Sequence, residues 1–280
     1  MKEQLIKIPH NVKIKLKNFS ADYTKGFKDK EEVKKKVEKN LKTMSELQDV
    51  LYAHDKYSIL IILQAMDAGG KDGTIRHVMS GVNPQGCQVF SFKKPSDEEL
   101  DHDYLWRIHK SLPERGRIGI FNRSYYEEVL VARVHPEILQ KEKLPPELIT
   151  KDIWKTRFRQ INDFEKYLYE NGTRIIKLFL HISKEEQKNR FLSRQQDPTK
   201  NWKLSKPDME ERKHWDEYMN AFEDMINNTS TKWAPWYIIP SNKKWFRNYI
   251  VSEIISKVMK SLDISYPKLS DESLVNIKIE

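Results

Sequence analysis

Residues 58–74 of this chain read SILIILQAMDAGGKDGT, and this stretch decides the fold. The run 58–65 is short, apolar and rich in isoleucine, which is typical of a central parallel strand covered on both faces. The chain has only 9 glycines, yet Gly69, Gly70 and Gly73 follow this run within a few residues. A helical pattern then begins near Thr74. The stretch predicts a strand, a glycine turn and a helix N-terminus in direct succession.

Such a turn presents unpaired backbone N–H groups and a partial positive charge to an anion, and Lys71 adds a full charge. The phosphate-loop pattern G-x-x-x-x-G-K-[ST] is only partly met, because Ala65 replaces its first glycine and Asp72 replaces its hydroxyl residue. That hydroxyl normally binds Mg²⁺, and Asp67 offers an oxygen ligand instead. We predict that this loop binds phosphate; the alternative is that the glycines only permit a tight turn. The predicted phosphate-binding residues of the loop are Ala68, Gly69, Gly70, Lys71, Asp72, Gly73 and Thr74.

Similar apolar runs recur at residues 88–92, 118–121, 175–182 and 236–239, with helical patterns between most of them. This alternation predicts a doubly wound α/β sheet. Apolar stripes mark two helices and are expected to lie in the core. The first stripe is Ile149, Ile153, Phe158, Ile161, Phe164 and Leu168, and the second is Trp215, Tyr218, Met219, Phe222 and Ile226.

Polar residues follow the run 118–121, and parallel sheets bind ligands at the carboxyl ends of their strands. Asn122 and Glu127 are candidate metal ligands beside Asp67, and Arg123 can fork onto phosphate oxygens. Surface salt bridging is the competing explanation. Further cations that could reach this edge are Arg133, Lys93 and Lys94. We predict catalytic roles for Asp67, Lys71, Asn122, Arg123, Glu127 and Arg133.

Two capping-box spacings, Ser183 with Glu186 and Asp208 with Glu211, predict two helix starts separated by the polar loop 196–207. We interpret residues 184–214, approximately, as a helical lid. Gln187, Arg190 and Arg194 share one helical face, and Lys200 and Lys203 follow in the loop. Arg190, Arg194 and Lys203 are thus candidates for cations that close over phosphate, although a solvated basic face is the more ordinary explanation.

Composition limits the function classes. The 280 residues carry a formal charge of +9, which suggests an anionic partner but does not identify it. Cys87 is the only cysteine, which excludes an intramolecular disulfide and a cysteine-rich zinc site. No H-E-x-x-H or G-x-S-x-G spacing supports zinc or serine-ester hydrolysis. No long apolar window predicts a membrane segment, so we expect a soluble, cytoplasmic protein with no membrane partner.

No linker rich in proline or glycine divides the chain. We expect an N-terminal basic arm and helix over residues 1–50, with the arm mobile. One domain containing the lid should then span residues 51–262, followed by a C-terminal tail at 263–280.

The segments MDAGGKDGTIRHVMSGVNPQGCQVFSFKKPSDEEL (66–100) and GRIGIFNRSYYEEVLVARVHPE (116–137) together resemble the family-2 polyphosphate kinases. The resemblance extends through QKNRFLSRQQDPTKNWKLSKPD in the lid, HWDEYMNAFEDMI, and WAPWYIIPSNKKWFR, and it covers most of residues 10–262.

The resemblance implies a three-layer α/β/α P-loop kinase fold with a mainly parallel sheet and a helical lid. It also implies phosphoryl transfer between inorganic polyphosphate and a nucleotide with Mg²⁺ (or Mn²⁺ in its place), in a homo-oligomer such as a dimer or tetramer. Asp67 and Lys71 match the family's phosphate loop, Asn122 and Arg123 its second motif, and Arg190 and Arg194 its lid cations. Many members have aspartate at the position of Asn122, which makes Glu127 the better acidic ligand here. Asn122 with Glu127 resembles the subgroup that accepts AMP as well as ADP; guanine nucleotides remain open.

Two other functions compete with this one. A nucleotide kinase that uses ATP as donor would share the fold, the lid and the metal. A basic module that binds nucleic acid is the other, since a basic chain with 7 Trp and 12 Tyr could combine phosphate contacts with base stacking. Most aromatic residues have core spacing, so we expect no specific nucleic-acid partner.

Overall fold

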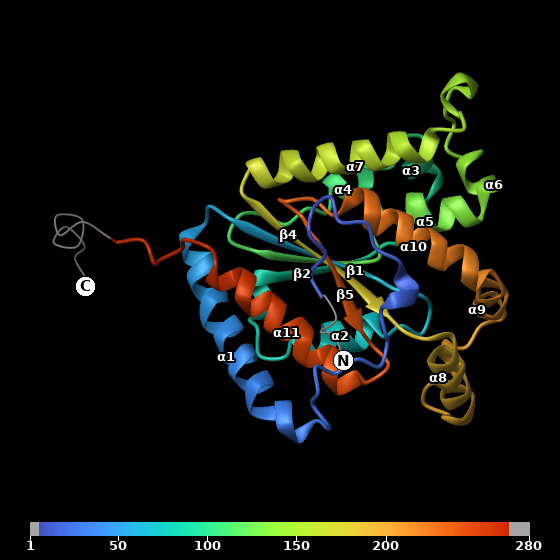
Figure 1. Cartoon of the computed structure of the whole chain (residues 1–280). Coiled ribbons are helices and arrows are strands. Elements are labelled where there is room, and N and C mark those ends of the chain that lie inside the picture. Colours follow the sequence, from blue (N-terminus) through green and yellow to red (C-terminus); the bar gives the residue numbers. More distant parts are fainter. Residues whose placement is uncertain (1–5, 269–280) are drawn as a thin grey trace.

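A computed structural model describes residues 6–268 of the chain (Figure 1). Five strands form one fully parallel sheet with the order β2-β3-β1-β4-β5. Their bounds are β1 Ser58–Gln64, β2 Cys87–Ser91, β3 Ile118–Asn122, β4 Thr173–His181 and β5 Trp236–Pro240. Each strand overlaps one of the five apolar runs, which confirms the predicted α/β sheet.

Strand β1 lies at the centre of the sheet, and every one of its residues is buried. Its neighbours are β3 and β4, with Leu63 opposite Asn122 on one side and opposite Leu178 on the other. A strand covered on both faces cannot alternate polar and apolar residues, which explains the unbroken isoleucine and leucine run. This register places the end of β1 level with the end of β3, where the predicted site residues begin.

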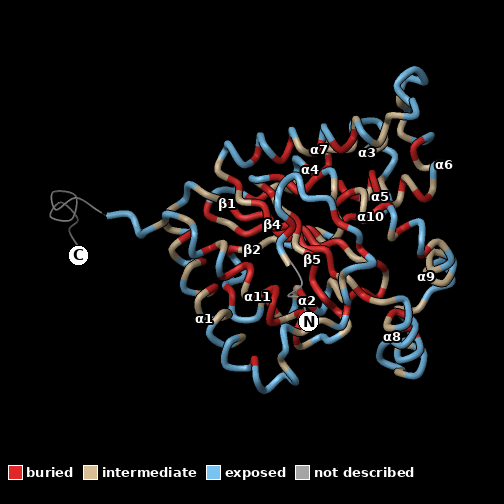
Figure 2. Tube along the Cα trace, viewed as in Figure 1, coloured by how far each residue is buried: buried red, intermediate tan, exposed pale blue. Residues whose placement is uncertain are grey.

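Helices cover both faces of the sheet, so the molecule has the predicted three layers (Figure 1). One layer holds α1 (Glu31–His54), α2 (Lys71–Val78) and α11 (Lys244–Lys260). The other holds α5 (Glu127–Val134), α7 (Ile153–Glu170) and α10 (Trp215–Thr229). Figure 2 shows the buried residues concentrated in the sheet and on the helix surfaces that face it. The remaining helices are α3 Asp97–Leu100, α4 Trp106–His109, α6 Pro136–Leu139, α8 Lys184–Gln196 and α9 Lys206–Glu211, with 3-10 turns at Leu16–Asn18, Pro84–Gly86, Pro146–Leu148, Asn201–Lys203 and Arg212–His214.

The two predicted stripes lie largely in the core. On α7, Phe158, Ile161, Phe164 and Leu168 are buried. On α10, the buried stripe residues are Trp215, Tyr218, Phe222 and Ile226. Ile149 was wrongly placed in the first stripe, because it precedes α7 and is 39% exposed.

The prediction of a mobile N-terminal arm is wrong for residues 6–30. Ile8 N–H donates to the Trp236 carbonyl at 2.9 Å, and Ile238 N–H donates to the Ile6 carbonyl at 2.9 Å. Ile8 and Leu16 are buried, so the apolar residues between the lysines attach this segment to the fold. Helix α1 then packs on α11 and continues past the predicted boundary at residue 50. Most of the predicted C-terminal tail, residues 269–280, lies outside the described residues.

The region predicted to be the lid contains α8 and α9 and lies at one side of the molecule (Figure 1). Its first predicted start is confirmed, because the Ser183 hydroxyl accepts from Glu186 N–H at 3.1 Å. The second is wrong by a few residues. Ser205 caps α9, and its hydroxyl accepts from Asp208 N–H at 3.3 Å. The helix begins there because the proline that follows in the first turn favours a helix start. Among residues 6–268, no helix combines the length and apolar character that crossing a bilayer requires.

Candidate active site

The glycine loop between β1 and α2 requires glycine at two positions. A Cβ on Gly69 would lie 2.5 Å from the Cβ of Ala65, and Gly69 N–H donates to the Met66 carbonyl at 2.9 Å. Gly70 has φ +100, a conformation that side chains disfavour, and it precedes the first residue of α2. Ala68 also has positive φ, at +58. The loop thus turns sharply enough to direct the N-terminal amides of α2 outward, as a phosphate site needs.

Lys71 begins α2 and folds back over the loop. Its Nζ donates to the Ala65 carbonyl at 3.0 Å. Burial lowers the pKa of Lys71, and the neighbouring charge of Arg123 lowers it further. Thr74 donates its hydroxyl to the Gly70 carbonyl at 2.9 Å, so this side chain stabilises the turn rather than facing outward.

Arg123 joins the two strand ends. It follows β3 with φ +64, and its N–H donates to the Leu63 carbonyl of β1 at 3.1 Å. Its guanidinium lies 2.9 Å from the carboxylate of Asp67 and 3.8 Å from that of Glu127. Burial raises the pKa of Glu127, while the charge of Arg123 acts in the opposite direction. The structure therefore brings together Asp67, Lys71, Arg123 and Glu127, four residues predicted as catalytic.

The oxygen donors around Arg123 fit a hard divalent cation. Asp67 and Glu127 contact the same guanidinium, so their carboxylates converge on one positive charge. Asn122 donates instead to Asp72 at 2.9 Å, which leaves its side-chain oxygen as the candidate ligand. Mg²⁺ commonly uses one or two carboxylates together with substrate phosphates. Within residues 6–268, no group of three or more histidine, cysteine, aspartate or glutamate side chains that could hold a metal ion is found.

Two lid side chains attach α8 to the glycine loop. Gln187 donates to the Asp67 carbonyl at 2.9 Å. Arg190 is 8% exposed and donates to the carbonyls of Ala68 at 2.8 Å and Gly69 at 3.0 Å, as well as to that of Ser241. Arg190 therefore supports the loop from behind rather than acting as the flexible cation that the sequence suggested.

The outer lid lies near the loop without enclosing it. Lys203 Nζ lies 3.8 Å from the Asp72 carboxylate, and Arg194 lies over the Phe191 ring at 5.6 Å. Asp208 was not predicted as a site residue. Burial raises its pKa, and repulsion from Asp67 adds to the effect while Arg194 opposes it. The sequence marked Asp208 only as part of a helix start. Its proximity to Asp67 results from folding and could not be seen in the sequence.

Arg247 on α11 is a second residue that the sequence did not reveal. It is 3% exposed, and a Cβ on Gly70 would lie 2.0 Å from its Nη1. Among the described residues its hydrogen bonds go to the side-chain oxygen of Asn248, at 3.2 Å and 3.0 Å. Burial lowers the pKa of Arg247 to about 10, and the charge of Arg190 contributes. No carboxylate pairs with this guanidinium in the described structure, so it directs uncompensated charge at the loop.

A cavity of about 280 Å³ opens beside Arg123 and Glu127. Nine of its 17 lining residues are charged and seven are apolar or aromatic, a mixture that suits a charged ligand with an apolar part. Lys93 and Lys94, which the sequence placed at this edge, also line it. The apolar and aromatic residues of the wall include Phe92, Leu100, Tyr104, Val131, Ala132 and Ile138.

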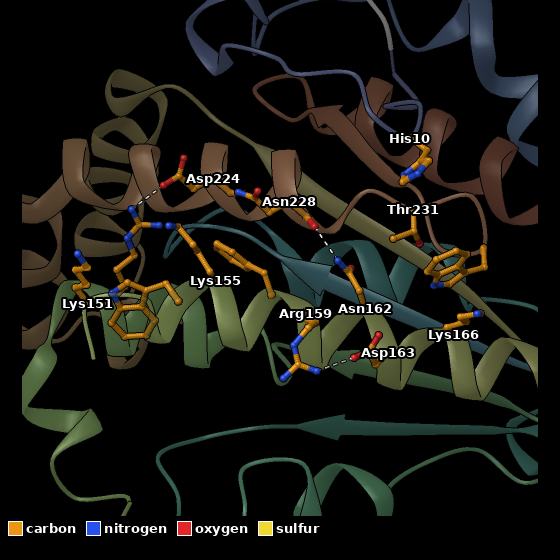
Figure 3. Close-up of a pocket in the computed structure, with 14 residues that line it drawn as sticks. His10, Lys151, Lys155, Arg159, Asn162, Asp163, Lys166, Asp224, Asn228 and Thr231 are labelled. Atoms are coloured by element: carbon orange, nitrogen blue, oxygen red, sulfur yellow. Dashed lines mark hydrogen bonds and ion pairs between the residues drawn. The ribbon is translucent and has the colours of Figure 1, made fainter. Parts of the chain in front are cut away.

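Arg133 lies in a different cavity, of about 730 Å³, between α7, α10 and the N-terminal segment (Figure 3). Its guanidinium lies 2.6 Å from the Asp224 carboxylate. Arg159 in the same cavity similarly pairs with Asp163 at 3.1 Å. Arg133 is more than one helical turn beyond Glu127 on α5, and its ion-pair partner, Asp224, is on α10. The structure does not bring it into the cluster around Arg123.

Comparison with known proteins agrees with this geometry. The family model described as Polyphosphate kinase 2 (PPK2) matches residues 27–267. An ADP-polyphosphate phosphotransferase of Rhodopseudomonas palustris is 49% identical over 269 residues, 96% of this chain and 93% of that protein. An AMP/ADP-polyphosphate phosphotransferase of Meiothermus ruber is 44% identical over 257 residues, 91% of this chain and 92% of that protein. The crystal structure of polyphosphate kinase 2 from Arthrobacter aurescens TC1 has a TM-score of 0.86 and 37% identity, covering 96% and 94% of the two chains. This chain belongs to the polyphosphate kinase 2 family.

Proposed function

We propose that this protein transfers phosphoryl groups reversibly between inorganic polyphosphate and AMP or ADP. The observation that carries the proposal is the position of Arg123, whose guanidinium contacts Asp67 on the glycine loop and Glu127 in the lining of the 280 Å³ cavity. A group transferred between a phosphate on the loop and a nucleotide in the cavity would pass this point. The names of the two relatives supply the substrate class, polyphosphate with AMP or ADP.

The donor phosphates bind at the loop in this proposal. The amides at the start of α2, the ammonium of Lys71 on the same helix and the guanidinium of Arg247 on α11 converge there. Charge placed in advance where negative charge accumulates lowers the barrier of phosphoryl transfer, which depends mainly on positioning and electrostatics. Lys203 and Arg194 of the lid add charge from the open side.

The acceptor nucleotide occupies the cavity with its phosphates toward Arg123. A terminal phosphate is already ionised near neutral pH, so no strong general base is required and alignment supplies most of the rate. We propose that Asp67 and Glu127, with Asn122 assisting, hold Mg²⁺, which neutralises phosphate charge when bound. Mn²⁺ would suit the same oxygen donors. The homo-oligomeric state and the cytoplasmic location expected from the sequence stay predictions.

The test is nucleotide turnover with Mg²⁺. One reaction contains AMP or ADP with polyphosphate, and a parallel reaction contains the same acceptor with a nucleoside triphosphate that is not ATP. ATP or ADP formed only with polyphosphate supports the proposal. Turnover only with the nucleoside triphosphate would indicate an ordinary nucleotide kinase, and binding of single-stranded nucleic acid without any turnover would indicate a binding module.

A further inference from the structure

The inner wall of the 280 Å³ cavity holds two glutamates on one arginine. Arg157 is 2% exposed, and its Nη1 donates to Glu128 Oε2 at 3.2 Å while its Nη2 donates to Glu142 Oε2. The guanidinium also lies 4.5 Å from the centre of the Tyr104 ring. Glu128 and Glu142 line the cavity together with Phe92 and Tyr104. This fixed arrangement has no part in the phosphate chemistry described above.

One oxygen of this cluster has no protein partner in the described structure. Glu142 Oε1 is buried and accepts no hydrogen bond, while Oε2 is held by Arg157. A buried polar atom without a partner costs stability, so such an atom in a cavity wall points to a ligand donor.

Glu128 and Glu142 lie side by side on Arg157. Burial raises the pKa of Glu128 to about 8, and repulsion from Glu142 adds to the shift while Arg157 opposes it. A carboxylate oxygen has two lone-pair sites, so a proton from Glu128 can satisfy at most one of those on Glu142 Oε1.

We propose that Glu142 is a specificity-determining residue that accepts a hydrogen bond from the exocyclic amino group of the acceptor's base, and so favours adenine over a 6-oxopurine. The proposal rests on the proposed function, because it places an acceptor nucleotide in this cavity. The apolar and aromatic residues of the lining suit the faces of a base, and the charged Arg123 and Glu127 in the same lining suit the end that carries the phosphates.

Adenine and hypoxanthine distinguish this role most simply. Adenine has an amino group at C6, which donates to a carboxylate. Hypoxanthine has a carbonyl oxygen there, which would face the charge of Glu142, and its only donor on this edge, N1–H, lies one ring position away. Sites built to receive a substrate N–H discriminate strongly against analogues that lack it.

The experiment compares AMP with IMP, both in turnover with polyphosphate and Mg²⁺ and in equilibrium binding by calorimetry without polyphosphate. The wild type should prefer AMP by about tenfold or more in kcat/KM and in Kd. Glu142→Gln should reduce that ratio toward one, because a glutamine amide can donate to the 6-oxo group or accept from the amino group. The control is Glu137→Gln, which removes the same charge from a side chain that is 59% exposed and does not line the cavity.

A wild-type protein that treats AMP and IMP alike would overturn the proposal, as would a Glu142→Gln protein that keeps the full preference. If no nucleotide is turned over with polyphosphate, the proposed function fails, and the binding measurement still decides the role of Glu142. If Glu142→Gln does not fold, Ile138→Trp tests the pocket in its place. Filling this wall should raise the Kd for AMP and leave the polyphosphate KM unchanged; an unchanged Kd for AMP would overturn the proposal.

Discussion

Arg247 packs so closely on Gly70 that a Cβ at this glycine would stand 2.0 Å from the guanidinium Nη1. Arg247 is on helix α11 and Gly70 is in the loop before α2, and these two elements are far apart in the sequence. Close approach of a charged side chain to a phosphate loop is possible here only because residue 70 has no side chain.

Gly70→Ala should therefore abolish most of the phosphotransferase activity. The alanine must adopt φ +100 and must also displace Arg247. Gly81→Ala is the matched control, because Gly81 has φ +94 and no atom within 4 Å of the added Cβ. Both variants should lose about 1–2 kcal/mol of stability from backbone strain, measured by urea unfolding, but only Gly70→Ala should lose turnover. Equal activities in the two variants would show that the contact with Arg247 does not matter.

Replacing Arg247 should weaken the use of polyphosphate more than the use of nucleotide. Arg247→Met removes a buried charge beside the loop, and we expect kcat/KM for polyphosphate to fall about 10- to 100-fold. Steady-state kinetics with each substrate varied in turn measures the effect. Lys257→Met, which removes a 70% exposed cation from the same helix, is the control. A larger effect on the nucleotide KM would place Arg247 in the acceptor site instead.

Asp67→Asn should reduce kcat about 100-fold or more and raise the Mg²⁺ concentration needed for half-maximal rate. The side chain keeps its size but loses the charge that pairs with Arg123 and that we assign to the metal. Asp163→Asn removes an exposed carboxylate far from the loop and serves as the control. Chelation of divalent cations should stop the wild-type reaction, and addition of Mg²⁺ should restore it. Wild-type rates and an unchanged Mg²⁺ requirement in Asp67→Asn would refute the assignment.

Arg133→Met tests a catalytic role that the sequence predicted and the geometry does not favour. The ion pair with Asp224 is partly exposed, so its loss should cost about 1 kcal/mol or less. We expect a small fall in Tm by differential scanning fluorimetry and little change in turnover. Asp224→Asn should give a similar fall. A severe loss of turnover at unchanged Tm would restore the catalytic role of Arg133.

Glu128 should make the folded state sensitive to alkali. Its folded pKa of about 8 lies above its ordinary value of 4.5, so the folded state binds the extra proton between these limits. This contribution to stability is complete below about pH 4.5 and is lost as the pH rises through about 8. Burial is its main cause, and the charged groups that modify it are Glu142, Arg157 and Arg107.

Glu128→Gln removes this proton linkage. The Tm of the wild type should fall more steeply than the Tm of the variant between about pH 4.5 and about pH 8, the interval between the two pKa values. Both proteins contain the same other titrating groups, so the difference between the two curves isolates Glu128. Parallel curves would mean that Glu128 is ionised at neutral pH.

Much of the fold was predictable because buried parallel strands appear in the sequence as continuous apolar runs. The isoleucine run of β1 and the glycines after it located the sheet centre and the loop. The convergence of Asp67, Arg123 and Glu127 was also accessible, since the ends of neighbouring parallel strands share an edge. Their catalytic roles stay predictions until variants are measured.

Contacts between residues that are far apart in the sequence had no such sequence pattern. Arg247 and Asp208 are single charged residues in ordinary helical patterns, and only packing brings them near the loop. Arg190 had the pattern of an exposed lid cation, yet four backbone carbonyls surround it, including that of Asn242 at 3.3 Å. The N-terminal segment was misjudged because its lysines outnumber the few apolar residues that attach it to β5.

The anchoring of Arg190 also determines which part of the lid can swing. Its guanidinium bonds the middle of α8 to the glycine loop and to the residues after β5, and Gln187 adds a second bond to that loop one turn earlier. A closing movement that kept these bonds would leave the first half of α8 in place. It would pivot between Arg194 and Ser205 and would carry Lys203 and Asp208 with it.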